Sequence, residues 1–270
     1  MATSRMTQES GYPMERGMRG NLHVSCGVGE KPEIGSKVYL SLYHFVQVYW
    51  DRSQNKEMRF HYFLGFEEPC MLYEETETAG KTVYLNKKYE SALLNTGNYK
   101  IFNALALEKV LIAHESIILH ASYVNYKGKA ILFTAPSGTG KSTQAALWEK
   151  YKGAEVVNGD RVIIRKGKEG YEAWGIPICG SSDICLNRTL PIAAIVYLQQ
   201  GLNNHIQIMG FAERVKRLIS ETTISFFDHD FVERALEILQ SIGAQVPCYY
   251  YSCTKDENAV VKLCNTLEES

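Results

Sequence analysis

The segment 135–143 has the composition of a phosphate-binding loop. It differs from the pattern G-x-x-x-x-G-K-[S/T] only at its first position, where Ala135 replaces glycine. We expect Gly138 and Gly140 to adopt positive φ, so that backbone N–H groups turn toward phosphate oxygens. Lys141 would reach the β- and γ-phosphates, and the Ser142 hydroxyl would bind Mg²⁺. The segment therefore predicts that ATP or GTP binds with Mg²⁺, held by Ser137, Gly138, Thr139, Gly140, Lys141, Ser142 and Thr143.

The elements on either side of this loop are those that it needs. The run 130–134 is short and apolar, which predicts a buried strand entering the loop. The residues 141–151 predict an amphipathic helix leaving it, and the dipole of that helix would act on the same anion. Because strand, loop and helix follow in the required order, a chance match explains the pattern poorly.

Strands and helices alternate after residue 113. We expect a strand at 116–123, a hairpin-like turn at 126–129 and another tight turn at 166–170, which makes part of the sheet antiparallel. The alternation predicts an α/β domain with a mixed sheet. The remaining strands are expected at 155–157, 161–165, 171–174, 193–198, 205–209 and 248–253, and helices at 211–220, 231–242 and from 255.

The part before residue 113 is β-rich. Period-two alternation and β-branched or aromatic runs predict strands at 38–42, 45–50, 58–66 and 82–85. A helix is expected over 101–112, capped by Thr96 or Asn98. We therefore predict a flexible tail at 1–20, a β-rich N-terminal domain at 21–112 and a nucleotide-binding kinase domain at 113–270.

Composition excludes several classes of protein. Lys and Arg number 29 against 30 for Asp and Glu, so the chain lacks the basic footprint of a general nucleic-acid binder. It contains no apolar run of about 18 residues that would span a membrane, and no apolar core of a signal peptide near its N-terminus. The seven cysteines lack the spacing of a zinc site, and Cys179 and Cys185 have no second pair. We expect free thiols and a cytoplasmic protein with no membrane or nucleic-acid partner.

Three features together resemble the catalytic core of HPr kinase/phosphorylase and the wider group of HPr-kinase-like P-loop kinases. This core is similar to the nucleotide domain of ATP-dependent phosphoenolpyruvate carboxykinase. The features are the strand Leu119-His120-Ala121-Ser122, the loop after the hairpin, and the motif Val157-Asn158-Gly159-Asp160-Arg161-Val162. Two later stretches also resemble these relatives: Trp174-Gly175-Ile176-Pro177 and Leu190-Pro191-Ile192.

The resemblance covers residues 114–210 and implies a fold and an activity. The fold would be a mixed-sheet P-loop kinase core of the HPr kinase type, preceded by the β-rich domain. The activity would be ATP-dependent phosphoryl transfer, and the resemblance also implies a homo-oligomer.

Four departures from the family pattern argue against HPr itself as the substrate. The family motif usually has two adjacent aspartates, and the first is Gly159 here. Thr143 stands where HPr kinases usually carry an acid. The N-terminal domain does not resemble that of HPr kinase, and the phosphorylase signature is missing.

Two residues are the candidates for catalysis. Phosphoryl transfer needs a carboxylate that orients or deprotonates the acceptor hydroxyl, and Asp160 could supply it or bind Mg²⁺ beside Ser142. Alternatively, Asp160 caps the turn after Asn158. His120 could pair with Asp160 and share the acceptor proton, or it is a structural residue at a strand end.

Three further residues have competing explanations. Arg161 is expected to point away from Asp160 on its strand and to make a structural pair. Arg188 would contact a phosphate or an acidic acceptor, or lie in a solvated loop. Trp174 would shape the acceptor pocket or pack as a core aromatic residue.

Three functions remain open from the sequence. The leading one is a Mg²⁺–ATP-dependent kinase acting on a hydroxyl of a protein, a peptide or a small molecule. The second is a P-loop nucleotide-binding regulator or scaffold with weak or no catalysis, which the absence of one aspartate at Gly159 favours. Carboxykinase chemistry on an oxoacid is the least supported, because the chain is short and no arginine and metal constellation is visible.

Overall fold

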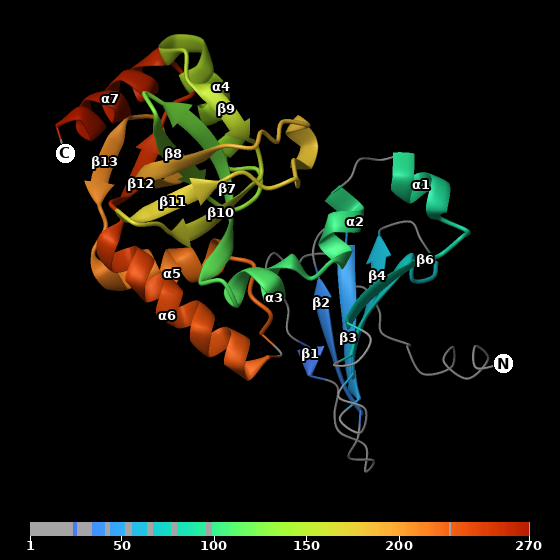
Figure 1. Ribbon diagram of the computed structural model, residues 1–270. Helices are drawn as coiled ribbons and strands as arrows, with labels where there is room; N and C mark the ends of the chain where they lie inside the picture. Colours follow the sequence, from blue (N-terminus) through green and yellow to red (C-terminus); the bar gives the residue numbers. More distant parts are fainter. Residues whose placement is uncertain are drawn as a thin grey trace. The chain divides into compact units, whose positions relative to one another are not determined.

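The computed structural model describes residues 24–25, 34–40, 44–51, 56–63, 67–76, 80–95, 99–226 and 228–269. The chain divides into two compact units, Met1–Glu90 and Ser91–Ser270 (Figure 1). The predicted tail at 1–20 lies outside the described residues. As a whole the chain is mixed α/β, with an antiparallel sheet in the first unit and a mixed sheet in the second.

The first unit is built on an antiparallel sheet of six strands in sequential order, which confirms the β-rich prediction. In β4 the alternation buries Glu57, Arg59 and His61 on one face. Arg59 forms an ion pair with Glu57 and lies over the Tyr73 ring, 5.5 Å from its centroid. The strands are β1 (Val24–Ser25), β2 (Ile34–Leu40), β3 (His44–Asp51), β4 (Lys56–Phe63), β5 (Met71–Thr76) and β6 (Gly80–Leu85).

Two short helices, preceded by a third, replace the single helix predicted at 101–112. They are α1 (Glu90–Asn95), α2 (Tyr99–Ala104) and α3 (Leu107–Ile112). The break between α2 and α3 has a physical cause, because Ala106 has a left-handed backbone with φ of 49°. The predicted caps, Thr96 and Asn98, lie outside the described residues.

The second unit begins earlier than the boundary predicted at residue 113. Phe102 of α2 and Leu111 of α3 pack against buried residues such as Ile118 and Ile176. These helices therefore share a core with the residues that follow them, and the division falls at Glu90 instead.

The second unit has a mixed sheet of eight strands, and each strand and helix predicted after residue 113 is found. β8 runs parallel to β12, and β12 runs parallel to β14, whereas β7 is antiparallel to β8. β11 pairs with both β10 and the start of β12, so this part of the sheet curls back on itself. The strands are β7 (Ser116–Tyr126), β8 (Lys129–Thr134), β9 (Glu155–Asn158), β10 (Arg161–Lys166), β11 (Tyr171–Trp174), β12 (Thr189–Gln200), β13 (His205–Ile208) and β14 (Cys248–Cys253).

Helices cover both faces of this sheet (Figure 1). On one face lie α4 (Lys141–Lys152) and α7 (Glu257–Glu268), and Trp148 of α4 packs 6.2 Å from Phe133 of β8, measured between ring centroids. On the other face lie α5 (Phe211–Glu221) and α6 (His229–Gln245), whose apolar residues share a core with Leu132 of β8. Alternate residues of β8 thus point into the two cores.

None of the described helices has both the length and the apolar character to cross a bilayer.

Candidate active site

The predicted phosphate-binding loop, residues 135–143, lies between β8 and α4, in the position that the sequence predicts. Gly138 has φ of 80° and Gly140 has φ of 115°, so positive φ is confirmed at both glycines. Ala135 is fully buried and is absent from the described residues with positive φ, so alanine fits the first position of the loop. The helix begins after Gly140 with no side-chain cap, which leaves the backbone N–H groups of its first turn without intrahelical partners. This arrangement suits an anion.

Lys141 is folded back onto the loop. Its ammonium donates hydrogen bonds to the carbonyl oxygens of Ala135 at 2.8 Å and Pro136 at 3.4 Å, and the residue is only 6% exposed. Burial lowers the pKa of Lys141, although the charges of Glu221 and Asp160 act in the opposite direction. A buried cation held only by neutral carbonyls fits a phosphate oxygen as its partner.

The hydroxyl residues of the loop are exposed or partly exposed. Ser142 and Thr143 are exposed on the first turn of α4, and the Ser142 hydroxyl is 3.5 Å from the carbonyl oxygen of Gly159. Ser137 is exposed, and the carbonyl of Thr139 accepts a hydrogen bond from the Gln200 amide at 3.3 Å. The loop and the motif at 157–162 are therefore adjacent.

Asn158 builds the turn that carries Asp160. Its side-chain oxygen accepts from the backbone N–H groups of Asp160 at 2.8 Å and Arg161 at 2.9 Å. Its amide nitrogen donates to the carbonyls of Ile176 and Ile178, each at 3.0 Å, and the residue is fully buried. The turn is thus capped by Asn158, and the Asp160 carboxylate faces other partners.

Three ionisable side chains form a chain beside Lys141. His120 Nε2 lies 3.5 Å from Asp160 Oδ1, and His120 Nδ1 lies 3.3 Å from Glu221 Oε2. His120 is the partly exposed residue in an otherwise buried stretch of β7, and Glu221 is 8% exposed. The structure therefore brings the two predicted candidates together and adds a third residue.

The carboxylates set the protonation of His120. Burial alone would lower the pKa of His120, but the hydrogen bonds to Asp160 and Glu221 outweigh it and the pKa is raised. Burial would raise the pKa of Asp160, but His120 and Arg161 outweigh it and the pKa is lowered. The arrangement thus favours an imidazolium between two carboxylates.

Sequence reasoning missed Glu221. This residue ends α5, and the chain then runs along β7, where Thr222 bridges Leu119 and the Thr223 N–H donates to the carbonyl of Ile118 at 2.9 Å. The pairing carries Glu221 to the His120 position. No spacing in the sequence connects these residues, and the β-prone pair Thr222–Thr223 after an amphipathic helix is the one local signal.

A short loop covers Gly159, the position at which the HPr-kinase-like motif usually has its first aspartate. A Cβ built on Gly159 would overlap the side chain of Ser182, and a Cβ on Gly180 would lie 2.8 Å from Asp160 Cγ. Gly180 and Ser182 belong to the 3-10 turn Gly180–Ser182. A second carboxylate at position 159 is therefore incompatible with the loop in this place.

The three other candidates have structural partners. Arg161 Nε lies 3.3 Å from Asp160 Oδ2, so its side chain pairs with the preceding residue and does not point away from it as expected. Arg188 makes two hydrogen bonds to the Glu155 carboxylate, at 2.9 and 3.1 Å. Trp174 donates to Glu172 at 3.1 Å.

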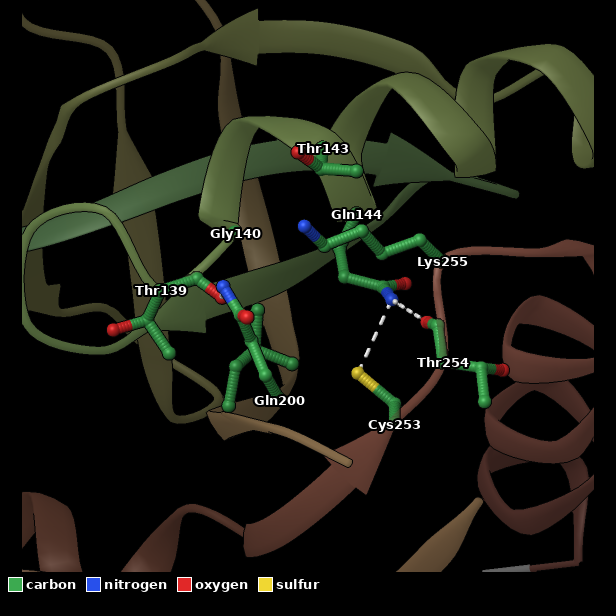
Figure 2. A pocket seen from close by; sticks show the side chains of 9 residues that line it. Thr139, Gly140, Thr143, Gln144, Gln200, Cys253, Thr254 and Lys255 are labelled. Carbon is green, nitrogen blue, oxygen red and sulfur yellow. Dashed lines mark hydrogen bonds between the residues drawn. The ribbon is translucent and has the colours of Figure 1, made fainter. Parts of the chain in front are cut away.

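A shallow, open hollow lies on the β12 and β14 side of the loop (Figure 2). Thr139 and Thr143 line it beside Gln200, the last residue of β12, and Lys255, which follows β14. Gln144 donates from its amide nitrogen to Cys253 Sγ and to the Thr254 carbonyl, each at 3.2 Å. The Gln144 side-chain oxygen is buried and has no hydrogen-bond partner. Asp160, His120 and Glu221 lie on the opposite side of the loop, toward β7.

The donor set suits Mg²⁺ bound together with a nucleotide. Within the described ranges, no group of three or more His, Cys, Asp or Glu residues could hold a metal ion. Mg²⁺ needs only one or two protein oxygens, because phosphates and water complete its shell. The Ser142 hydroxyl and the Asp160 carboxylate, on adjacent segments, are oxygen donors of the required kind.

Comparison with known proteins gives distant structural likenesses and no sequence match. No family model matches the chain, and no curated protein matches it. Among solved structures, the chain is similar to the Hpr(Ser) kinase/phosphatase from Coxiella burnetii, with 13% identity and a TM-score of 0.32. The match covers 56% of this chain and 93% of that one. At this distance the likeness identifies neither the activity nor the substrate of this chain.

Proposed function

We propose that the chain is a Mg²⁺- and ATP- or GTP-dependent phosphotransferase of the HPr-kinase-like group. It transfers a phosphoryl group to a hydroxyl of a protein, a peptide or a small molecule. The proposal depends on one observation. The buried Lys141 ammonium lies beside a row of three interacting ionisable side chains, those of Asp160, His120 and Glu221.

The loop binds the phosphates in this proposal. Phosphate oxygens replace the carbonyls of Ala135 and Pro136 as partners of Lys141, and the first-turn N–H groups of α4 bind the same anion. Ser142 and Asp160 would hold a Mg²⁺ ion, which would supply positive charge to offset that of the phosphates.

Asp160 orients the acceptor hydroxyl. Its lowered pKa keeps it ionised, so it accepts a hydrogen bond from the hydroxyl and takes the proton as the bond to phosphorus forms. His120, whose other ring nitrogen faces Glu221, fixes the Asp160 carboxylate and is a positioning residue rather than the base, because both of its ring nitrogens lie against carboxylates.

The nucleoside occupies the hollow on the other side of the loop. With the γ-phosphate at Asp160, the α-phosphate end points toward β12 and β14, where carboxyl ends of parallel strands form the usual ligand edge of an α/β sheet. The exposed Lys255 offers a cation there.

A second candidate function has its own support. Ser182 fills the place of the first family aspartate, so one carboxylate serves both metal binding and acceptor orientation. This favours a nucleotide-binding regulator or scaffold with weak or no transfer.

Incubation with γ-labelled ATP and Mg²⁺ separates the two candidates. Steady release or transfer of label that is lost in Asp160→Asn supports the phosphotransferase. Stoichiometric binding without turnover supports the regulator. Failure of the chain to bind either ATP or GTP overturns both.

A further inference from the structure

Two thiols lie close together in the loop 179–185, which covers the turn that contains Gly159 and Asp160. The Cys185 thiol donates to Cys179 Sγ at 2.9 Å, and both cysteines are free and partly exposed. The other described cysteines, Cys70, Cys248, Cys253 and Cys264, are buried. Disulfide sulfurs are about 2.05 Å apart, so bonding requires an approach of only about 1 Å.

Both ends of this loop are anchored on one residue. The Ile178 carbonyl, just before Cys179, accepts from the Asn158 amide at 3.0 Å, and Cys185 forms a β-bridge with Asn158. Between these ends, Ser182 donates to the Cys179 carbonyl at 2.9 Å. The two thiols thus lie at the two ends of a short loop, and both ends contact Asn158, the residue that builds the turn carrying Asp160.

The body of the loop contacts the residues next to the proposed reaction. Ser182 lies against Gly159, and Gly180 lies against Asp160, where any Cβ would collide. An acceptor that approaches Asp160 from this side must displace the loop, and a covalent link between its two ends would restrict that displacement.

We propose that Cys179 and Cys185 form a redox site that small disulfides, such as oxidised glutathione, convert to an intramolecular disulfide that locks the loop over Asp160. The existence of the site is independent of the proposed function, whereas its effect on turnover rests on it.

The reaction consists of two thiol–disulfide exchanges. The Cys185 thiolate attacks one sulfur of the small disulfide, whose S–S bond breaks and releases one thiol. Cys179, after losing its proton, attacks the Cys185 sulfur and releases the second thiol. Two protein thiols become one disulfide, and the small disulfide is reduced to two thiols that carry the protons.

The two cysteines can exchange these roles, because their sulfurs lie 2.9 Å apart and both are partly exposed.

The test compares reduced and glutathione-disulfide-treated wild-type protein by peptide mass mapping after alkylation. The expected product is one peptide or peptide pair that lacks two hydrogens and links Cys179 to Cys185, while the buried cysteines stay reduced. Oxidation should also slow amide hydrogen exchange at 159–160 and 179–185 several-fold, and dithiothreitol should reverse it. Cys179→Ser and Cys185→Ser should show no such slowing.

Several results would overturn the redox site. These are stable glutathione adducts without the internal link, no reaction at either cysteine, or a link that leaves exchange at 159–160 unchanged. Turnover tests the proposed function separately: if ATP hydrolysis exists, it should fall several-fold in the oxidised protein with nucleotide affinity retained. If the link and the exchange change appear but neither redox state hydrolyses ATP, the redox site stands and the phosphotransferase proposal fails.

Discussion

His120 Nδ1 lies 3.3 Å from Glu221 Oε2, although 101 residues separate the two along the chain. Since the other ring nitrogen faces Asp160, the two carboxylates together hold the imidazole and raise its pKa. The carboxylate at the end of α5 therefore acts on the proposed reaction through a histidine that it orients.

The pKa of His120 should fall in Glu221→Gln. The amide removes a negative charge that stabilises the imidazolium, while Asp160 remains and Lys141 still repels the proton. NMR titration of the His120 ring in the nucleotide- and metal-free protein measures the shift. Glu237→Gln, on the exposed side of α6, is the matched control and should leave the titration unchanged. An equal pKa in wild type and Glu221→Gln would contradict the assignment.

Stability should depend on pH through the same histidine. A folded pKa above the unfolded value, about 6.5, means that protonated His120 stabilises the fold below that value and that this contribution is lost as pH rises through the folded pKa. The Tm advantage of metal-free wild type over His120→Asn should thus be larger near pH 6 than near pH 8.5. A Tm difference that is constant or grows with pH would speak against a charged His120.

Lys141→Ala should weaken Mg²⁺–ATP binding. Losing a charge-assisted contact with a phosphate costs about 1.5–3 kcal/mol, which is roughly a 10- to 150-fold rise in Kd. Calorimetry measures both proteins beside Lys129→Ala, an exposed lysine at the opposite end of β8. Equal affinity in Lys141→Ala and wild type would exclude the loop as the phosphate site.

Asp160→Asn should affect turnover more than binding. The loop and Lys141 hold the phosphates, so the carboxylate contributes when the acceptor proton leaves. We expect kcat to fall by about 10²–10⁴-fold with nearly unchanged nucleotide Kd. Asp230→Asn, in the exposed first turn of α6, controls for charge and should match wild type. Wild-type kcat in Asp160→Asn would leave this carboxylate with a structural role.

Gly159→Asp should destabilise the protein even though it restores the residue of the family motif. The new side chain overlaps Ser182, and overpacking of this kind costs about 1–3 kcal/mol. Urea unfolding measures the loss in free energy of unfolding. A second substitution, Ser182→Gly, should recover part of this loss because it removes the side chain that the new aspartate overlaps. No destabilisation in the single variant would show that the loop yields easily.

Local patterns were enough to predict the second unit and its loop. β8 is a short apolar run, which is typical of a buried strand, and positive φ at Gly138 and Gly140 follows from residue type. The helical region before β7 was predicted less well, because the left-handed backbone at Ala106 has no signature in an apolar stripe.

Only those site residues that lie within recognisable sequence motifs could be predicted. The neighbourhood of Asp160 and His120 followed from the resemblance, but Glu221 reaches them through strand pairing after α5, which depends on the tertiary fold. Likewise, the pairing of Arg161 with Asp160 depends on the turn that Asn158 makes, since regular strand alternation would separate the two side chains.

The turn at Asn158 also determines how this protein ages chemically. An asparagine followed by glycine deamidates when the backbone nitrogen of the glycine attacks the side-chain carbonyl, which releases ammonia and leaves aspartate or isoaspartate after hydrolysis. In the folded chain, four hydrogen bonds hold the Asn158 side chain in place and resist that attack. Deamidation would turn a donor into a charged acceptor facing the carbonyls of Ile176 and Ile178. Stored protein should therefore gain mass at this dipeptide mainly through molecules that have opened locally, and those molecules should not recover the turn that carries Asp160.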